Sequence, residues 1–267
     1  MSEPVLLVEK TDGVAVVTLN RPDKLNSLSR ELRRELVSTF RSLHEDAQVE
    51  VVILTGNGRA FCAGLDLGEL SGEGQQADSD EGKRERENAV AGADVVAAVE
   101  NFGGPVIGAI NGFAITGGFE LALACDVLLL SDQARFADTH ARVGILPGWG
   151  LSQKLSRTIG IYRAKELSLS GNFLSAQQAV DWGLANRVVP AAELLEAAQA
   201  LARDMKTCPR TVLRAYKALI NEGYGQTMKD ALALEGTRSL EHMRTVSAAD
   251  ISGRRAAVQS RGRDQGN

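Results

Sequence analysis

Two adjacent glycines, Gly117 and Gly118, separate an apolar run that favours a strand (105–110) from a run that favours a helix (120–125). A helix that begins at such a glycine presents unpaired backbone N–H groups and the positive end of its dipole to an approaching ligand. Glu120 places a carboxylate in the first turn of this helix. Donors beside a carboxylate suit chemistry on a carbonyl, where an oxyanion is stabilised while an acid or base moves a proton. The alternative is a tight turn whose glutamate only complements the helix dipole.

Composition places the chain among ordinary globular proteins. It has 267 residues, of which 44% are hydrophobic and 24% charged, with a net charge of −4. This balance gives no reason to expect nucleic acid or a membrane surface as a partner. Three scattered cysteines do not form a disulfide framework, which predicts a reducing compartment and a cytoplasmic location. The three histidines show no metal-ligand spacing, so we predict no metal site.

Strand-like and helix-like segments alternate along the first half of the chain. Asp12-Gly13 lies between two apolar runs (5–8 and 14–19), which predicts a β-hairpin. Apolar residues recur at helical spacing from Leu32 to Leu43, with Ser29 as the expected N-cap. Further strands are predicted at 49–54, 106–110 and 126–130, and a helix at 93–99. The acidic, polar segment 68–88 is interpreted as a solvated loop, or alternatively as a lid over the site.

From Ala191 onward the sequence predicts one helix after another, with breaks at Pro190, Pro209 and Gly223–Gly225. The pattern therefore predicts an α/β core (residues 1–190) followed by an α-helical region (residues 191–267). Helices added to a complete core often pack against another subunit, so we expect oligomerisation, although a helical cap would give the same pattern. The basic tail after Arg254 is expected to be frayed.

A second small-residue stretch, residues 56–67, follows the strand predicted at 49–54. It begins like a dinucleotide fingerprint with Gly56 and Gly58, but Phe61 occupies the third glycine position, which argues against a nicotinamide site. Cys62 is interpreted as a small buried thiol because no histidine or acidic partner is identifiable for a nucleophile. The sequence also lacks the motifs of serine hydrolases and of P-loop enzymes.

The two stretches together resemble the crotonase (enoyl-CoA hydratase/isomerase) superfamily, and the resemblance spans almost the whole chain in order. It is carried by the motifs Arg21-Pro22-(x)3-Asn26-Ser27-Leu28, Ala60 to Leu67, Asn111-Gly112-(x)4-Gly117-Gly118-x-Glu120, Cys125-Asp126, Ala134 to Phe136, Gly144 to Gly148, and Leu169 to Gly171 through Ala185. The resemblance implies a crotonase-like spiral of ββα units with an α-helical C-terminal trimerisation region. It also implies a homotrimer or a dimer of trimers, an acyl-CoA thioester as substrate, and no cofactor other than the coenzyme A of that substrate.

Residue by residue, the resemblance implies that the backbone N–H groups of Leu65 and Gly117 form an oxyanion hole for the thioester oxygen. This agrees with the independent interpretation of both turns. Two residues depart from the usual pattern: Gly68 replaces a basic residue near the coenzyme, and Trp149 replaces a small residue beside the pocket. The residues expected to contact the substrate are Lys24, Leu25, Asn26, Ala63, Asp66, Leu67, Gly68, Pro147 and Trp149.

Two carboxylates handle water in the hydratases of this superfamily. Glu120 occupies the position of the first, but His140 occupies the position of the second, four residues after Phe136. A neutral imidazole accepts a hydrogen bond on one nitrogen and donates on the other, so His140 could still orient water, although it supplies no second negative charge. Asp138 is an alternative second carboxylate if the loop bends.

The first hypothesis is an enoyl-CoA hydratase-type lyase with Glu120 and His140 as catalytic residues. The second is a double-bond isomerase, because one carboxylate, Glu120, suffices to remove a proton and return it elsewhere. The third is a non-catalytic acyl-CoA-binding subunit, against which the retained Glu120 argues.

Overall fold

The computed structural model describes residues 3–71 and 94–265. Most of the segment 68–88, predicted as a solvated loop or lid, lies outside these residues. The chain forms two compact units, residues 1–214 and 215–267, and the boundary falls within helix α11 (Arg210–Tyr224). Each unit is described separately.

The first unit begins with the predicted hairpin. Strands β1 (Leu6–Thr11) and β2 (Val14–Leu19) pair antiparallel, and Asp12 and Gly13 form the turn with positive φ angles. A short 3₁₀ turn, η1 (Pro22–Lys24), leads to helix α1 (Arg30–Glu45). The Ser29 side chain accepts a hydrogen bond from the backbone N–H of Leu32, so the predicted N-cap is confirmed.

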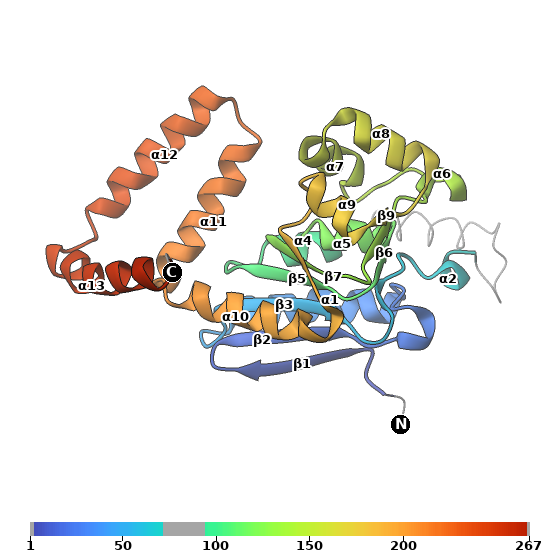
Figure 1. The fold of residues 1–267 in the computed structure, drawn as a ribbon, viewed down its shortest axis with the longest axis horizontal. Helices are drawn as coiled ribbons and strands as arrows, with labels where there is room; N and C mark the ends of the chain where they lie inside the picture. Colours follow the sequence, from blue (N-terminus) through green and yellow to red (C-terminus); the bar gives the residue numbers. More distant parts are fainter. Residues whose placement is uncertain (1–2, 72–93, 266–267) are drawn as a thin grey trace. The chain divides into compact units, whose positions relative to one another are not determined.

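Three successive turns of the chain each contribute one strand to a large sheet and one to a small sheet. Strands β3 (Val51–Gly56), β5 (Val106–Ile110) and β7 (Val127–Ser131) run parallel in a six-stranded sheet. The strand order is β1-β2-β3-β5-β7-β10, in which β10 spans Arg187–Val189. Strands β4 (Ala60–Cys62), β6 (Phe113–Ile115) and β8 (Arg135–Ala137) run parallel in a four-stranded sheet completed by β9 (Leu174–Ser175). The two strands of a turn are followed by helices: α2 (Leu67–Ser71) and α4 (Asp94–Glu100), then α5 (Gly117–Ala122), then α6 (His140–Val143). This is the predicted spiral of ββα units (Figure 1).

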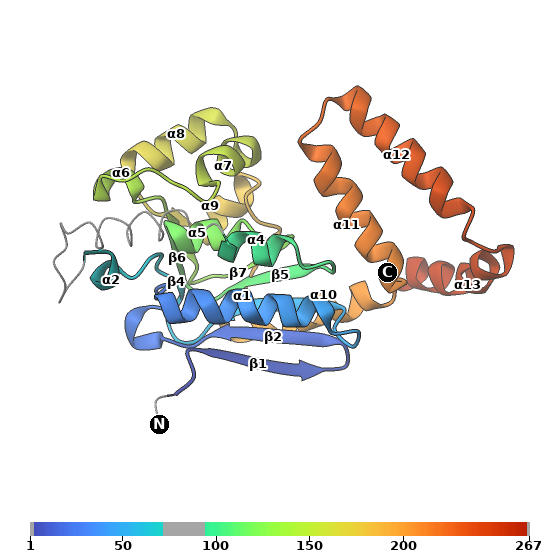
Figure 2. The ribbon, with the colours of Figure 1, turned by 180° about the vertical axis from the view of Figure 1, so that it is seen from behind.

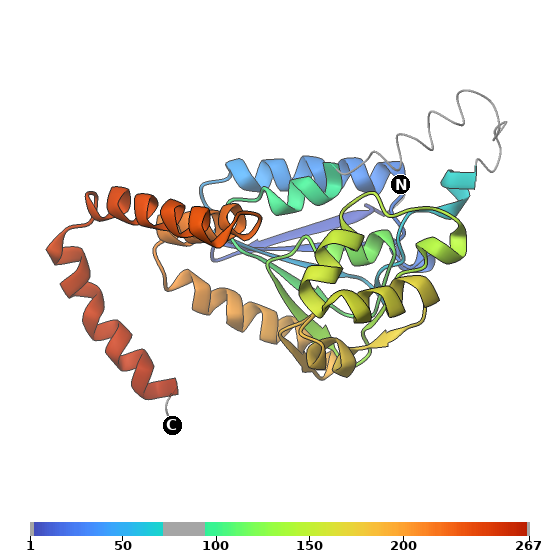
Figure 3. The same cartoon turned by 90° about the horizontal axis from the view of Figure 1, so that it is seen from above.

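Helices cover both faces of the six-stranded sheet. Helix α10 (Leu194–Lys206) crosses one face, seen in front of the sheet in Figure 1, and α1 with α4 covers the other face, seen in front in Figure 2. Figure 3 shows the sheet edge-on between these two layers. Leu194, Ala198 and Ala202 of α10 are buried against Ile53 and Leu129 of the sheet. Helix α10 therefore belongs to the first unit.

A helical layer completes the first unit beyond the second sheet. It comprises α7 (Leu151–Ile159), α8 (Ile161–Ser170) and α9 (Ala176–Asp181), followed by β10 (Arg187–Val189) at the sheet edge and the 3₁₀ turn η2 (Ala191–Glu193). Helices α7 and α8 pack against each other, and α6 packs against α8. These contacts fix the loop between α6 and α7, which carries Trp149.

The second unit contains the end of α11, helix α12 (Met228–Met243) and helix α13 (Ala248–Gln265). No residue of α11 or α12 is buried. The expected fraying after Arg254 is wrong, because α13 continues helical to Gln265. Among residues 3–71 and 94–265, no helix combines the length and apolarity that spanning a bilayer requires.

Candidate active site

The backbone at the start of α5 lies directly beside the backbone after Gly64. A Cβ atom added to Gly64 would lie 3.2 Å from the backbone nitrogen of Gly117, and one added to Gly117 would lie 3.6 Å from the nitrogen of Leu65. Within the described residues, neither the N–H of Leu65 nor that of Gly117 donates a hydrogen bond to the protein. The structure therefore brings together the two donors that the sequence assigned to an oxyanion hole.

Thr116, the residue before α5, holds this turn in an unusual conformation. Its φ of +54° lies in the region that β-branched residues rarely adopt. The surrounding structure holds it there: its N–H donates to the carbonyl of Ala137 at 2.9 Å, and its hydroxyl hydrogen-bonds the hydroxyl of Thr139. Gly117 is the first residue of α5, so its N–H lies in the first turn, where no carbonyl of the helix can accept it.

Glu120 is buried at the base of the same site, with 2% of its surface exposed. Its Oε1 accepts hydrogen bonds from the backbone N–H groups of Trp149, at 2.9 Å, and Leu151, at 3.3 Å. Its Oε2 accepts none from the described residues. Burial raises the pKa of Glu120 above its ordinary value, because the two N–H groups and His140 offset only part of the loss of hydration. The hydrogen bonds to Oε1 therefore hold the carboxyl in place, and Oε2 is the oxygen available to exchange a proton.

His140, at the start of α6, lies between two carboxyl groups. Its Nε2 is 3.8 Å from Oε2 of Glu120, and its Nδ1 is 2.7 Å from Oδ1 of Asp138. The backbone N–H of His140 also donates to Oδ1 of Asp138, at 3.2 Å. Burial alone would raise the pKa of Asp138, but hydrogen bonds from His140 and from the Ser168 side chain outweigh it and lower that pKa. Asp138 does not line the pocket, and its carboxyl contacts the Nδ1 side of the His140 ring.

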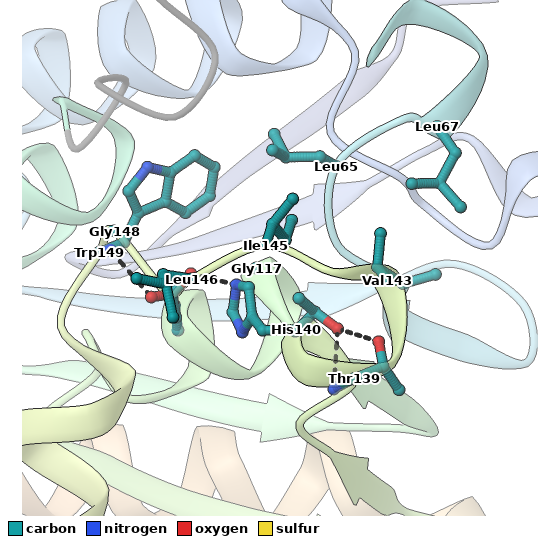
Figure 4. Close-up of a pocket in the computed structure, with 13 residues that line it drawn as sticks. Leu65, Leu67, Gly117, Thr139, His140, Val143, Ile145, Leu146, Gly148 and Trp149 are labelled. Atoms are coloured by element: carbon teal, nitrogen blue, oxygen red, sulfur yellow. Dashed lines mark hydrogen bonds and ion pairs between the residues drawn. The ribbon is translucent and has the colours of Figure 1, made fainter. Parts of the chain in front are cut away.

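Glu120, His140, Leu65 and Gly117 line one pocket. Figure 4 shows His140, Gly117, Leu65 and Trp149 around it. The volume open to the centres of water molecules is about 70 Å³, whereas one water needs roughly 10–15 Å³ on this measure. The pocket thus has room for a small acyl group together with a water. Seven residues predicted for the site line it: Ala63, Leu65, Leu67, Gly117, Glu120, His140 and Trp149.

Other predicted substrate contacts do not line this pocket: Lys24, Leu25, Asn26, Asp66, Gly68 and Pro147. Two of these side chains make hydrogen bonds and ion pairs within the protein. The amide of Asn26 is fully buried and joins the backbone of Arg21 to that of Asn57 and Ala60. The carboxylate of Asp66 forms an ion pair with Arg21 at 3.0 Å. Both hold the loops beside the pocket in place.

The sequence did not identify the remaining wall of the pocket, which consists of Thr116, Thr139, Val143, Ile145, Leu146 and Gly148. It also did not identify the bond from Asp138 to His140. The spacing of these two residues was a usable signal, because an aspartate two residues before a histidine commonly accepts from its backbone N–H. Cys62 is fully buried, and burial raises the pKa of its thiol to about 12, so it is an inert core residue as predicted.

The protein has a spiral of parallel strands, and two backbone N–H donors lie beside a buried carboxyl. These features together define the crotonase class of enzymes. The chain belongs to the enoyl-CoA hydratase/isomerase family, whose model matches residues 9–255. It is 43% identical over 242 residues to a protein named probable enoyl-CoA hydratase 1, peroxisomal, from Arabidopsis thaliana, covering 90% of this chain and 87% of that one. The crystal structure of an enoyl-CoA hydratase from Bacillus anthracis superposes with a TM-score of 0.86 at 34% identity, covering 96% of both chains. A monofunctional enoyl-CoA isomerase from M. smegmatis superposes with a TM-score of 0.73 at 32% identity, covering 86% of this chain and 98% of that one.

Proposed function

We propose that this protein is an enoyl-CoA hydratase, which adds water across the 2,3 double bond of an acyl-CoA thioester. The observation that carries the proposal is the pair of N–H groups from Leu65 and Gly117, which have no hydrogen-bond acceptor among residues 3–71 and 94–265 and lie beside a buried carboxyl and an imidazole. A thioester oxygen between the two donors would gain stabilisation as the enolate forms, which draws electrons from the β-carbon.

Two groups are then available to handle water on one side of the bound double bond. Oε2 of Glu120 and Nε2 of His140 are 3.8 Å apart, so one water oxygen at an ordinary hydrogen-bond distance contacts both. Two proton-handling groups suit hydration, since one proton leaves the water and another must reach the α-carbon. Acyl-CoA is thus the proposed substrate, with no further cofactor.

Double-bond isomerisation is the second candidate, and one observation favours it. Glu120 is the only carboxyl that lines the pocket among the described residues, and a single base suffices to move a proton between carbons. The M. smegmatis isomerase is also a similar structure, at a lower TM-score (0.73) than the B. anthracis hydratase (0.86). The non-catalytic alternative is disfavoured, because an acyl-binding pocket has no need of a carboxyl with an unbound oxygen.

The deciding experiment incubates the purified protein with 2-enoyl-CoA and, separately, 3-enoyl-CoA thioesters and follows the products by mass. Hydratase activity raises the mass of 2-enoyl-CoA by one water. Isomerase activity converts 3-enoyl-CoA to its 2-enoyl isomer without a change in mass, which chromatography resolves. Conversion of the 3-enoyl substrate alone would overturn the hydratase proposal, and conversion of neither would favour the binding subunit.

The assembly and compartment are proposed with the function. A homotrimer or dimer of trimers accounts for the exposed apolar residues of the second unit, which are treated in the Discussion. A cytoplasmic location rests on the cysteines Cys62, Cys125 and Cys208, which form no disulfide within the described residues. The Arabidopsis relative is named as peroxisomal. Fractionation of the source cells would decide between compartments.

A further inference from the structure

Asp138 does not line the pocket, yet its carboxyl is buried, with 3% of its surface exposed, and points at the far side of the His140 ring. It accepts two hydrogen bonds from His140, one from the backbone N–H and one at Nδ1. The Ser168 side chain, from α8, is a further group that lowers the pKa of this carboxyl. A buried carboxyl held this firmly requires an explanation beyond the packing of the loop.

An ionised carboxylate only accepts hydrogen bonds, so Nδ1 of His140 must carry a hydrogen when Asp138 is charged. The hydrogen bonds that lower the pKa of Asp138 keep it charged at neutral pH. In a neutral imidazole with hydrogen on Nδ1, Nε2 is unprotonated. This nitrogen faces Oε2 of Glu120 and the pocket.

We propose that Asp138 is a positioning residue that fixes His140 in its Nδ1–H tautomer, so that the unprotonated Nε2 serves as the base in hydration. This assignment rests on the proposed hydratase function. In this tautomer Nε2 of His140 can accept a proton from water but cannot donate one. Asp138 contacts neither water nor acyl group in this scheme and acts only through the imidazole.

The proton steps balance with Glu120 as the acid. His140 Nε2 takes a proton from the water, and the water oxygen bonds to the β-carbon while the double-bond electrons move to the thioester oxygen. When this enolate collapses, the α-carbon takes the proton of Oε2 of Glu120, and the carboxylate then regains a proton from His140. Glu120 is suited to start protonated, because its buried carboxyl disfavours the charge.

The titratable groups facing His140 come from two segments. Glu120 on α5 faces Nε2, and Asp138, in the segment between β8 and α6, faces Nδ1; Ser168 on α8 contributes a hydroxyl. Replacing Asp138 by asparagine keeps the shape but removes the requirement for a hydrogen on Nδ1, since an amide presents either an oxygen or an N–H. A mixture of tautomers is then expected, and Nε2 is blocked in part of the molecules.

The test is to record long-range ¹H–¹⁵N correlation spectra of the protein labelled with ¹⁵N-histidine. The chain has three histidines, His44, His140 and His242, and loss of one signal in His140→Gln assigns His140. His44 is an internal reference for the other tautomer. Its Nδ1 accepts a hydrogen bond from the N–H of Gly103 at 3.1 Å, so the hydrogen of its neutral ring must lie on Nε2. We expect neutral His140 to show the Nδ1–H pattern in the wild type and a mixed pattern in Asp138→Asn.

Kinetics supply the second measurement. Asp138→Asn should lower kcat for hydration by at least ~10² with little change in KM and should shift the acidic limb of the pH profile, as loss of a tautomer-fixing group does. Ser168→Ala, which leaves both His140 contacts intact, should have a smaller effect in the same direction, and the exposed Asp181→Asn should have none. An Nε2–H pattern in the wild type, or an Asp138→Asn variant with the wild-type pH profile, would overturn the inference. Absence of hydration in the wild type would overturn the proposed function instead, while the spectra would still report the tautomer.

Discussion

At the scale of single residues, Glu120 is the group on which the proposed chemistry depends most. We predict that Glu120→Gln lowers kcat by at least ~10² and leaves acyl-CoA binding largely unchanged, because the amide keeps both backbone hydrogen bonds but exchanges no proton. Steady-state kinetics and calorimetric titration with a product acyl-CoA measure the two effects. Glu166→Gln, at an exposed position of α8, is the matched control. Wild-type turnover in Glu120→Gln would remove this residue from the mechanism.

The same substitution has a predicted effect of opposite sign on stability. Burial raises the pKa of Glu120 in the folded protein above its unfolded value of about 4.3. The folded state therefore holds this proton more tightly, and the free energy of unfolding falls as pH rises from the unfolded pKa through the folded pKa. Glutamine does not titrate, so Glu120→Gln should gain stability over the wild type as pH rises.

Urea unfolding at pH 4 and pH 8, at one fixed protein concentration, measures this difference. The variant should be closer to the wild type at pH 4 and more stable than it at pH 8. An equal difference at both values would contradict the raised pKa. Active sites commonly contain residues that lower the stability of the folded protein but are needed for activity.

Trp149 determines the size of the acyl pocket at the same scale. The residue is 5% exposed, and a Cβ atom on Gly117 would lie 3.2 Å from its Cζ3 atom, so the ring forms a wall directly beside the oxyanion donor. We predict that Trp149→Ala shifts kcat/KM by at least ~10-fold in favour of eight-carbon over four-carbon 2-enoyl-CoA, since even one additional methylene in an apolar pocket is worth about 1–3 kcal/mol. Because deleting a buried tryptophan costs about 3–5 kcal/mol of stability, Trp149→Phe is the milder second variant. An unchanged chain-length preference in both variants would show that the acyl chain does not extend towards Trp149.

At the scale of elements, the two loops that carry the oxyanion donors depend on glycine at position 64. Its φ is +92°, and a Cβ there would lie 2.9 Å from the carbonyl oxygen of Ile115 and 3.2 Å from the nitrogen of Gly117. We predict that Gly64→Ala separates the two donors and lowers kcat by about 10²–10³, the usual cost of losing one such donor.

Gly160→Ala is the control for this prediction. Gly160, between α7 and α8, has a comparable φ of +85° but open space around the added Cβ, so it reports backbone strain without the steric clash. Both variants should lose a similar part of their stability from that strain. Only Gly64→Ala should lose turnover, and equal loss in both would refute the assignment of the donors.

Local signals in the sequence predicted the elements that are stabilised locally. Asp12-Gly13 identified the hairpin and Ser29 identified the start of α1, because turn and cap preferences act over a few residues. The second sheet was not predicted. Its strands are two or three residues long, too short for a periodic pattern, and they pair residues far apart, such as Phe113 with Arg135.

Among the residues of the site, those with a local sequence signal were predicted, and those whose role depends on tertiary contacts were not. The glycine turn and Glu120 were found because a helix start has a sequence signature. The spacing of Asp138 and His140 was a usable signal for the bond to the backbone N–H, but the bond to Nδ1 depends on the orientation of the imidazole ring, which only the folded chain determines. The roles of Asn26 and Asp66 in holding loops likewise depend on contacts with Ala60 and Arg21 that only the folded chain provides.

At the scale of the whole molecule, the second unit exposes more apolar surface than a free helical segment usually tolerates. Helix α12 has four large apolar side chains that are each more than half exposed, and at 100° per residue they fall within an arc of roughly 120°. These residues are Met228, Leu232, Leu240 and Met243. Tyr216, Ile220 and Tyr224 of α11 are likewise exposed. An amphipathic helix with no buried residue needs a partner for its apolar face.

We predict that this face is buried between copies of the chain, which form a trimer or a dimer of trimers in solution. Sedimentation velocity at micromolar concentration should give one of these masses for the wild type. Leu232→Asp should shift the mass towards the monomer, because a carboxylate in an apolar interface loses its hydration without a partner. Val8→Asp, which adds the same charge at an exposed position on the edge strand β1, should leave the mass unchanged. A stable wild-type monomer would contradict the predicted assembly. The apolar face of α12 would then remain exposed to water, which would lower the solubility of the protein.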